Sequence, residues 1–337
     1  MPAFYYLVPG LTTGRLDGES RFRYWKRCLL KRRKQLPSGG VKIIYQHCDL
    51  LNQNGYSAVP VHLGDFTVDF FPHKTKPIHK QQALELMAKD DILICPEIIP
   101  GLAAEFPCEK KVAFIQNWAL TERGTGPEKR YEDFGFSSLL SCSQFIRNYM
   151  KDRSSLPCDV VTNGIDLNVF HNAERDNDRC RVIVLNRRNI ADAREAFALL
   201  DDSLKKGVEF IVLENKYSQG EIAEYLRSAD IFLAIGYPEG FALPPLEAMA
   251  SGCAVVGFTG GGGLEHMLNG KTALVATDGN VEELATCLEN VLTNSELKEQ
   301  IRSAGVKKAQ EFSLENMEKQ LVKFAGYLQP AIEGCTS

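Results

Sequence analysis

A strand, a loop and a proline-led helix in the second half of the chain constrain this sequence more than any other stretch. Residues 230–235 (DIFLAI) form a short apolar run bounded by turn residues, which predicts a buried strand. Pro244 and Pro245 then suit the first turn of a helix that Gly252 ends. Because the first backbone N–H groups of a helix lack intrahelical partners, this helix start is predicted to bind an anion.

Two glutamates flank the predicted anion site. Glu239 lies in the loop before the helix, and Glu247 lies eight residues later, just inside the helix. Both carboxylates can therefore approach one ligand bound at the helix start. The alternative is an ordinary strand–loop–helix unit with two solvated acids, which the rest of the chain disfavours.

Strand and helix patterns alternate through the chain and are interrupted by one charged linker at residues 171–179. Such alternation predicts parallel, doubly wound sheets. We therefore expect an α/β protein with two Rossmann-like domains, at 1–172 and 173–312, and a last helix at 313–330 that crosses back to the first. Ligands bind outside the carboxyl ends of such strands, which predicts a central cleft between the domains. The predicted strands of the first half lie at 4–8, 57–62, 67–71, 91–95, 111–116, 139–143 and 159–162.

Composition narrows the function further. A net charge of −4 over 337 residues gives no reason to expect nucleic acid as a partner, and no apolar run approaches the length of a membrane helix. The ten cysteines form no C-x-x-C pair, and the six histidines do not fall at metal-ligand spacing. These features predict a cytoplasmic protein without a metal site.

Residues 21–35 (RFRYWKRCLLKRRKQ) carry eight basic residues and no acid, with Phe22, Trp25 and Leu29 at helical spacing. Two interpretations stay open. Arg21–Lys34 contacts an anionic membrane surface or an anionic acceptor, or it forms a solvated helix whose aromatic residues pack on the domain. The pattern favours the second.

Four motifs resemble those of glycosyltransferase family 4, whose members are retaining, nucleotide-sugar-dependent enzymes of GT-B fold. Glu239–Val256 closely resembles the family's E-x(7)-E region, and Asn163–Asp166 with Phe170 resembles its N-G-I/V-D…F segment. Ser38–Gly40 resembles the amino-terminal glycine loop, and Gly261–Glu265 resembles the later G-G-x-x-E segment. The resemblance is specific over the carboxyl-terminal half and fragmentary over the amino-terminal half.

The resemblance implies a role for each matched residue. Glu239 would contact hydroxyls of the donor sugar, and Glu247, an ionised acceptor, would hold the ribose hydroxyls of the nucleotide. The helix start would bind the diphosphate through the backbone around Gly240, Phe241, Ala242 and Leu243. The turn at Gly39 and Gly40 would let the donor approach the backbone closely.

The cations of the diphosphate site depart from the family pattern, which has Gly-Arg and then Lys about six residues later. Arg187 matches the first position, with Arg188 beside it, and Arg194 follows seven residues after Arg187 in place of the lysine. Two cations are wanted because the leaving diphosphate gains charge and no metal site is evident. The alternative for Arg194 is a charge on a helix surface.

Many family members also have a histidine after the fourth strand of the acceptor domain, whereas this chain reads CPEIIP at residues 95–100. Topology alone predicts that Glu97, or Asn117 with Trp118, lines the sugar and acceptor side instead.

Together these features predict a retaining, metal-independent glycosyltransferase without a cofactor. It would move a sugar from a nucleoside-diphosphate sugar to a glycan, lipid-linked or small-molecule acceptor. Two alternatives stay open: a non-catalytic nucleotide-sugar-binding or partner subunit of the same fold, and a sugar-nucleotide epimerase. The location is expected to be cytoplasmic, with peripheral contact at the inner membrane face if Arg21–Lys34 binds lipid.

Overall fold

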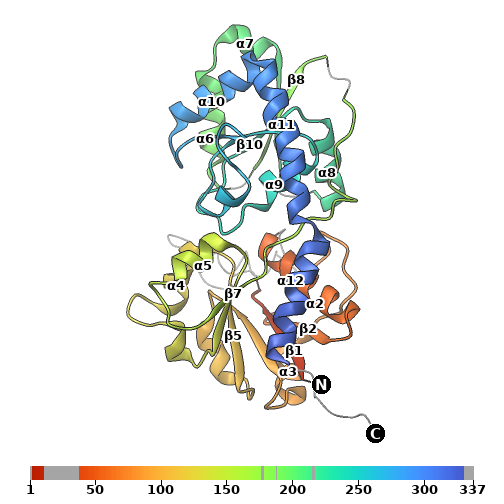
Figure 1. Cartoon of the computed structure of the whole chain (residues 1–337), viewed down its shortest axis with the longest axis vertical. Coiled ribbons are helices and arrows are strands. Elements are labelled where there is room, and N and C mark those ends of the chain that lie inside the picture. Colours follow the sequence, from red (N-terminus) through yellow and green to blue (C-terminus); the bar gives the residue numbers. More distant parts are fainter. Residues whose placement is uncertain (1, 11–37, 176–177, 187, 215–216, 330–337) are drawn as a thin grey trace, which may run out of the picture.

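The computed structural model describes residues 2–10, 38–175, 178–186, 188–214 and 217–329, which form two α/β domains stacked along the long axis (Figure 1). The first domain contains a seven-stranded sheet in the order β3-β2-β1-β4-β5-β6-β7, and the second a five-stranded sheet in the order β12-β11-β10-β8-β9. Neighbouring strands are parallel in both sheets. The prediction of two doubly wound α/β domains is confirmed.

Helices and strands alternate along each domain. The first domain comprises β1 (Ala3–Val8), α2 (Gly39–Gln53), β2 (Ser57–His62), β3 (Ile78–His79), α3 (Lys80–Leu86), β4 (Ile92–Pro96), β5 (Lys110–Ile115), α4 (Thr121–Thr125), β6 (Ser138–Ser141), α5 (Gln144–Met150) and β7 (Cys158–Val160). The second comprises β8 (Cys180–Leu185), α6 (Ile190–Leu199), α7 (Asp202–Lys206), β9 (Val208–Leu213), α8 (Gln219–Ser228), β10 (Ile231–Ala234), α9 (Leu243–Ala250), β11 (Ala254–Gly257), β12 (Leu274–Val275), α10 (Val281–Thr293) and α11 (Ser295–Ala309), and α12 (Leu314–Leu328) follows.

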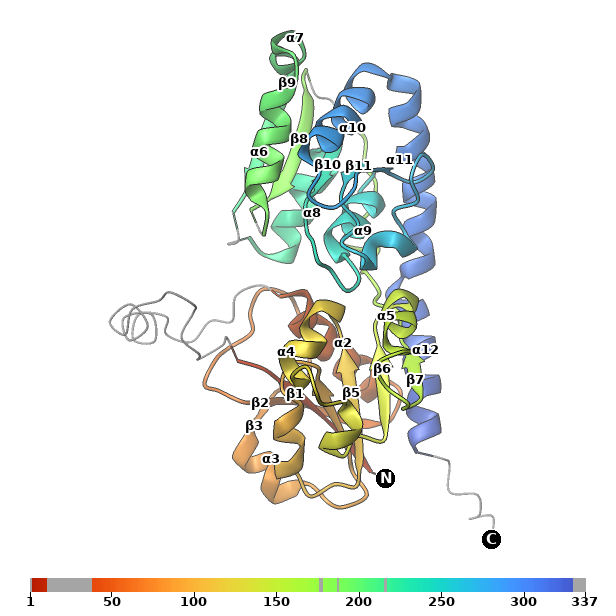
Figure 2. The ribbon, with the colours of Figure 1, turned by 90° about the vertical axis from the view of Figure 1, so that its left-hand side faces the viewer.

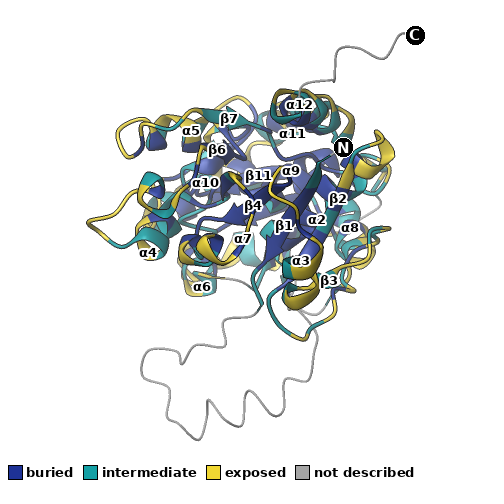
Figure 3. Cartoon of the chain, turned by 90° about the horizontal axis from the view of Figure 1, so that it is seen from below, coloured by how far each residue is buried: buried dark blue, intermediate teal, exposed yellow. Residues whose placement is uncertain are grey.

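The second sheet is covered by apolar side chains on both faces, because successive residues of a strand point to opposite sides. In β8, Val182 and Val184 pack in one apolar cluster, and Ile183 packs in the other. Helices α6 and α10 contribute to the first cluster, and α8 and α9 to the second. Figure 3, which views the molecule from below, shows buried strands at its centre and helices with exposed residues around them.

The chain passes between the domains in two segments that lie side by side. The backbone N–H of Ile165 donates to Phe312 O (2.9 Å), and that of Leu314 donates to Ile165 O (3.1 Å). Helix α12 then packs against α2 of the first domain (Figure 1). Figure 2 shows α11 and α12 following one another along one side of both domains. The segment around Ile165 and the segment from Phe312 to Leu314 are therefore hydrogen-bonded to each other where the chain passes between the domains. The domain boundaries at 172 and 312 stay predictions.

One predicted strand is wrong. Residues 67–71 form no strand, and the sheet edge is β3 at Ile78–His79 instead. The apolar residues of this segment serve packing: Phe71 is buried with its ring 5.9 Å from that of Tyr45. The basic segment Arg21–Lys34 lies outside the described residues. Within the part of the chain that is described, no helix is both long and apolar enough to cross a lipid bilayer.

Candidate active site

The loop between β10 and α9 faces the first domain across a cleft. Helix α9 starts at Leu243 with prolines in its first turn, as predicted. The residue before it, Ala242, has φ +61°, a left-handed conformation that is strained for a residue with a Cβ. Strain of this kind persists where the surroundings fix the backbone and is frequent at ligand sites. The glycine turn of α2 lies opposite, since a Cβ built on Gly39 would be 3.3 Å from Leu243 Cδ1.

A cavity of about 1010 Å³ lies between the start of α2 and the start of α9. It brings together residues that are far apart in the sequence and that the sequence assigned to different sides of the site. Its lining includes Gly39, Gly40, Glu97, Asn117, Arg188, Glu239, Gly240, Phe241, Ala242 and Leu243.

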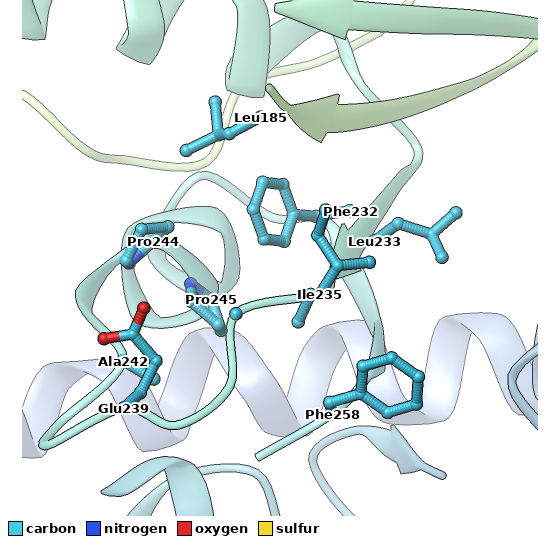
Figure 4. A pocket seen from close by; sticks show the side chains of 11 residues that line it. Leu185, Phe232, Leu233, Ile235, Glu239, Ala242, Pro244, Pro245 and Phe258 are labelled. Carbon is cyan, nitrogen blue, oxygen red and sulfur yellow. The ribbon is translucent and has the colours of Figure 1, made fainter. Parts of the chain in front are cut away.

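Glu239 lies between this cavity and a smaller apolar pocket. Its carboxylate is 3.6 Å from Arg188 Nη2, and its side chain is 22% exposed. Figure 4 shows the carboxylate beside Ala242 and the two prolines, with Leu185 and Phe232 across the pocket. Glu239 is the only ionisable side chain among the eleven residues that line this pocket. It can therefore offer hydrogen-bond acceptors to a polar ligand held against an apolar wall.

Glu247 occupies the other end of the cleft. Its Oε1 lies 2.8 Å from Lys42 Nζ, an ion pair between α9 of the second domain and α2 of the first. Both side chains line a cavity of about 710 Å³ together with Phe70, Phe170 and Tyr217. A carboxylate beside aromatic and aliphatic walls suits a nucleoside, which has an apolar ring face and polar hydroxyls.

The first domain holds the Glu239 loop by its main chain. The indole N–H of Trp118 donates to both Glu239 O and Gly260 O, each at 3.1 Å. Ser143 Oγ donates to Gly240 O at 3.0 Å, and Asn117 Nδ2 lies 3.4 Å from Pro238 O. Trp118, predicted on the acceptor side, does not line the cavity and instead makes this contact between the domains.

Gly240 is required by the close approach of the domains. A Cβ at this position would lie 1.7 Å from the carbonyl oxygen of Gln116 and 2.7 Å from its carbonyl carbon. No side chain fits there unless the backbone moves. The glycine therefore sets how closely the Glu239 loop approaches the first domain.

Glu97 is the buried carboxyl group on the first-domain side of the cavity. Its Oε1 accepts a hydrogen bond from the backbone N–H of Asn117 at 2.9 Å. Burial raises the pKa of Glu97 to about 7, and hydrogen bonds from backbone groups only partly offset it. At neutral pH this carboxyl group can therefore both donate and accept hydrogen bonds.

The three arginines predicted to bind the diphosphate differ in where they lie. Arg188 lines the cavity, and Arg187 lies outside the described residues. Arg194 is exposed on α6 and does not line the cavities around Glu239 and Glu247. Helix α6 starts after Asn189, whose side chain donates to the carbonyl oxygens of Ile235 and Tyr237. Among the described residues, no group of three or more His, Cys, Asp or Glu side chains is placed to hold a metal ion.

Lys42 is the site residue that sequence reasoning missed. It lies two residues after the Gly39–Gly40 turn and interrupts the apolar run from Val41 to Ile44. A lysine within this apolar run was the available signal. Its partner Glu247 is 205 residues away in the chain, and no local pattern links the two.

Two Rossmann-like domains whose strands point their carboxyl ends at a shared cleft define the GT-B fold. Solved structures share it: sucrose-phosphate synthase from Thermosynechococcus elongatus aligns over 97% of this chain and 99% of its own, with TM-score 0.65 and 14% identity. Anabaena HepE in complex with UDP-glucose aligns over 96% and 99%, with TM-score 0.67 and 13% identity.

Residues 170–308, which span most of the second domain, match the family model "Glycosyl transferases group 1". An uncharacterized glycosyltransferase of Methanocaldococcus jannaschii is 21% identical over 204 residues, which are 55% of this chain and 58% of the relative. An alpha-1,6-glucosyltransferase of Actinobacillus pleuropneumoniae is 29% identical over 190 residues, which are 51% and 54%. The chain thus spans little more than half the length of these curated relatives.

Proposed function

We propose that the protein is a retaining, metal-independent glycosyltransferase that moves a sugar from a nucleoside-diphosphate sugar to an acceptor. The observation that carries the proposal is a pair of adjoining cavities at the starts of α2 and α9. Both are lined by Gly39 and Leu243, and Glu247 lines one of them while Glu239 lines the other. The match to the group 1 glycosyltransferase family model supports it. Because HepE has the same fold and was solved with UDP-glucose, UDP-glucose is the first donor to test.

The donor would lie along α9. The nucleoside would occupy the cavity at Glu247, which accepts hydrogen bonds from the ribose hydroxyls. The diphosphate would bind at the start of α9, where N–H groups and the positive end of the helix dipole favour an anion, with Arg188 as a cation beside it. The sugar would then reach Glu239.

The acceptor would enter from the first domain, where Glu97 and Asn117 line the same cavity. A glycan, a lipid-linked sugar or a small molecule offers the hydroxyl groups that these side chains bind. A lipid-linked acceptor would place this otherwise cytoplasmic protein at the inner membrane face through Arg21–Lys34. Flotation with anionic liposomes at low salt tests that contact, and a protein that stays in the bottom fraction contradicts it.

The proposed reaction needs no strong protein base. The bond between the anomeric carbon and the diphosphate oxygen breaks, and the acceptor oxygen bonds to that carbon on the same face. The acceptor's proton passes to the leaving phosphate oxygen. Arg188 and the start of α9 stabilise the charge that develops there, and the closed domains exclude competing water.

The test incubates the protein with a panel of nucleotide sugars and acceptors, with and without EDTA, and measures release of nucleoside diphosphate. We expect release with at least one donor, unchanged by EDTA, and a product with the donor's anomeric configuration by NMR. Complete loss of turnover on chelation would contradict the metal-independent reaction, and an inverted anomer would contradict retention.

A matched pair of variants locates the donor site. Glu247→Gln should weaken donor binding, whereas Glu282→Gln, on the exposed first turn of α10, should not. Donor binding by calorimetry without turnover on any acceptor would favour the non-catalytic binding subunit over the enzyme.

A further inference from the structure

Lys42 and Glu247 form a buried ion pair that bridges the two domains inside a cavity. Lys42 comes from α2 and Glu247 from α9, and their side chains are 8% and 11% exposed. The ammonium also lies 5.4 Å from the centre of the Phe170 ring. The acceptor domain therefore places a positive charge within the cavity assigned to the donor nucleotide.

Stability alone is a poor explanation for this pair. Removing two charges from water costs more than their attraction often returns, and apolar residues of similar size would hold the domains together at least as well. Apolar side chains such as Ile44 and Leu243 are available around the same cleft. The location of the pair at a cavity wall points instead to a polar ligand.

The hydrogen-bonding capacity of the pair fits one ligand group in particular. Lys42 contacts Oε1 of Glu247, and a carboxylate has a second oxygen that accepts further hydrogen bonds. An ammonium group likewise has three donors, of which this contact uses one. The adjacent carboxylate and ammonium can therefore accept one hydrogen bond and donate another. This matches a vicinal diol, in which each of two neighbouring hydroxyl groups can donate or accept a hydrogen bond.

We propose that Lys42 and Glu247 together bind the ribose 2′,3′-diol of the donor nucleotide, with Glu247 accepting from one hydroxyl and Lys42 donating to the other. This inference rests on the proposed function and adds a residue of the acceptor domain to the donor site. The nucleotide is then held by both domains at once, so that its ribose contributes to holding the cleft closed.

The test is isothermal titration calorimetry with UDP and GDP, and with their 2′,3′-dideoxy analogues, on the full chain. Wild type should bind the better ribonucleotide at least about tenfold more tightly than its dideoxy analogue, the effect of losing one or two hydrogen bonds. Lys42→Met should weaken binding of the ribonucleotide by about tenfold and leave binding of the dideoxy analogue nearly unchanged. The ratio of the two affinities should therefore fall.

Two further variants keep the test decisive. Lys42→Arg keeps a cation and should recover part of the discrimination. Lys42→Met with Glu247→Gln removes both charges, so it leaves no unpaired buried ion and should cost less than the sum of the single changes. Lys319→Met, which removes an exposed pair with Glu315 on α12, is the matched control and should change nothing.

The outcomes separate the two proposals. Wild type that binds no nucleoside diphosphate overturns the proposed function and this inference with it. Wild type that binds, combined with unchanged ribose discrimination in Lys42→Met, overturns the role of Lys42 alone. Unchanged discrimination in the double variant as well would overturn the ribose contact of Glu247 too. Discrimination that narrows in Lys42→Met and recovers in Lys42→Arg supports the inference, because a purely structural lysine would not change the preference for ribose.

Discussion

The two ends of the cleft are joined by different kinds of contact. At the Glu247 end, the domains meet through charged side chains, with Lys42 Nζ 2.8 Å from Oε1. At the Glu239 end they meet through neutral hydrogen bonds to main-chain carbonyls, donated by Trp118 and Ser143. The carboxylate of Glu239 lies 3.6 Å from the exposed Arg188.

This difference suggests how each carboxylate is kept ready for a ligand. The carboxylate of Glu247 is oriented by a direct contact with Lys42, whereas the Glu239 loop is held through its backbone and its carboxylate makes only a longer contact with Arg188. Among the residues that the structure describes, the neighbouring Glu97 has no ion-pair partner, and burial raises its pKa to about 7. The nucleotide end therefore depends on charge, and the sugar end depends on backbone position.

Gly240→Ala should produce the largest effect on activity. The new Cβ would lie 1.7 Å from Gln116 O, so the Glu239 loop must move away from the first domain. Because a displacement of about 1 Å can cost roughly 100-fold in rate, we expect kcat/KM to fall by about that factor.

The control is Gly220→Ala on α8, whose added Cβ meets nothing within 4 Å. Nucleotide binding at the Glu247 end should survive in Gly240→Ala, since that end is held separately. Equal losses at both ends would show that the cleft moves as one unit, and wild-type turnover would contradict the close contact.

Glu97→Gln tests, through the pH dependence of stability, whether the carboxyl group of Glu97 has a raised pKa in the folded protein. The pKa of Glu97 is raised from its ordinary value of 4.5 to about 7 in the folded protein. As pH rises, the carboxyl group therefore ionises first in the unfolded chain and only later in the folded protein. Stability from this group is therefore complete at low pH and falls as pH rises toward 7. Between pH 5 and pH 8 the loss should be roughly 2.5 kcal/mol in wild type and absent in the variant.

Urea unfolding at several pH values measures this difference, and subtracting the variant removes the contribution of other titrating groups. Glutamine keeps the oxygen that accepts from Asn117 N–H, so the local structure should persist. Glu105→Gln, at an exposed ion pair with Lys80, should follow wild type. Parallel pH profiles for wild type and Glu97→Gln would contradict a raised pKa.

The sequence predicted the local features of the site well. A loop ending in Pro244-Pro245 specifies where a helix starts, and the structure begins α9 at Leu243. The apolar runs likewise became the strands β4, β5, β6, β8, β9 and β10. These features depend on neighbouring residues, which a single sequence displays directly.

Contacts between distant residues were not predictable in the same way. Nothing near Trp118 indicates that its indole donates to carbonyls 121 and 142 residues away. Arg194 was spaced correctly for a cation, yet its direction depends on where α6 begins, and it is exposed. Spacing along the chain thus identified candidates, but packing between the domains decided which of them reach the cleft.

Trp118→Phe should have a moderate effect that is confined to the sugar end. It removes the indole N–H shared by Glu239 O and Gly260 O but keeps an aromatic ring near Phe145 and Tyr149. Loss of about one net hydrogen bond predicts kcat roughly tenfold lower, with little change in donor KM. Tyr327→Phe, at an exposed ring on α12, is the control. A change in donor KM alone would instead connect Trp118 to the nucleotide end.

Arg188→Met should have the smallest effect on stability, and it tests whether Glu239 needs a charged partner in the folded protein. The Arg188 side chain is 55% exposed, and its contact with Glu239 is 3.6 Å long. Exposed ion pairs contribute little because water and salt screen them, so the free energy of unfolding should change by less than about 0.5 kcal/mol. Urea unfolding at low and high salt measures it, and donor titration of the same variant separately tests Arg188 as a diphosphate ligand. A destabilisation well above this value that disappears at high salt would show that the sugar end also depends on charge. The contrast between the two ends would then be one of degree.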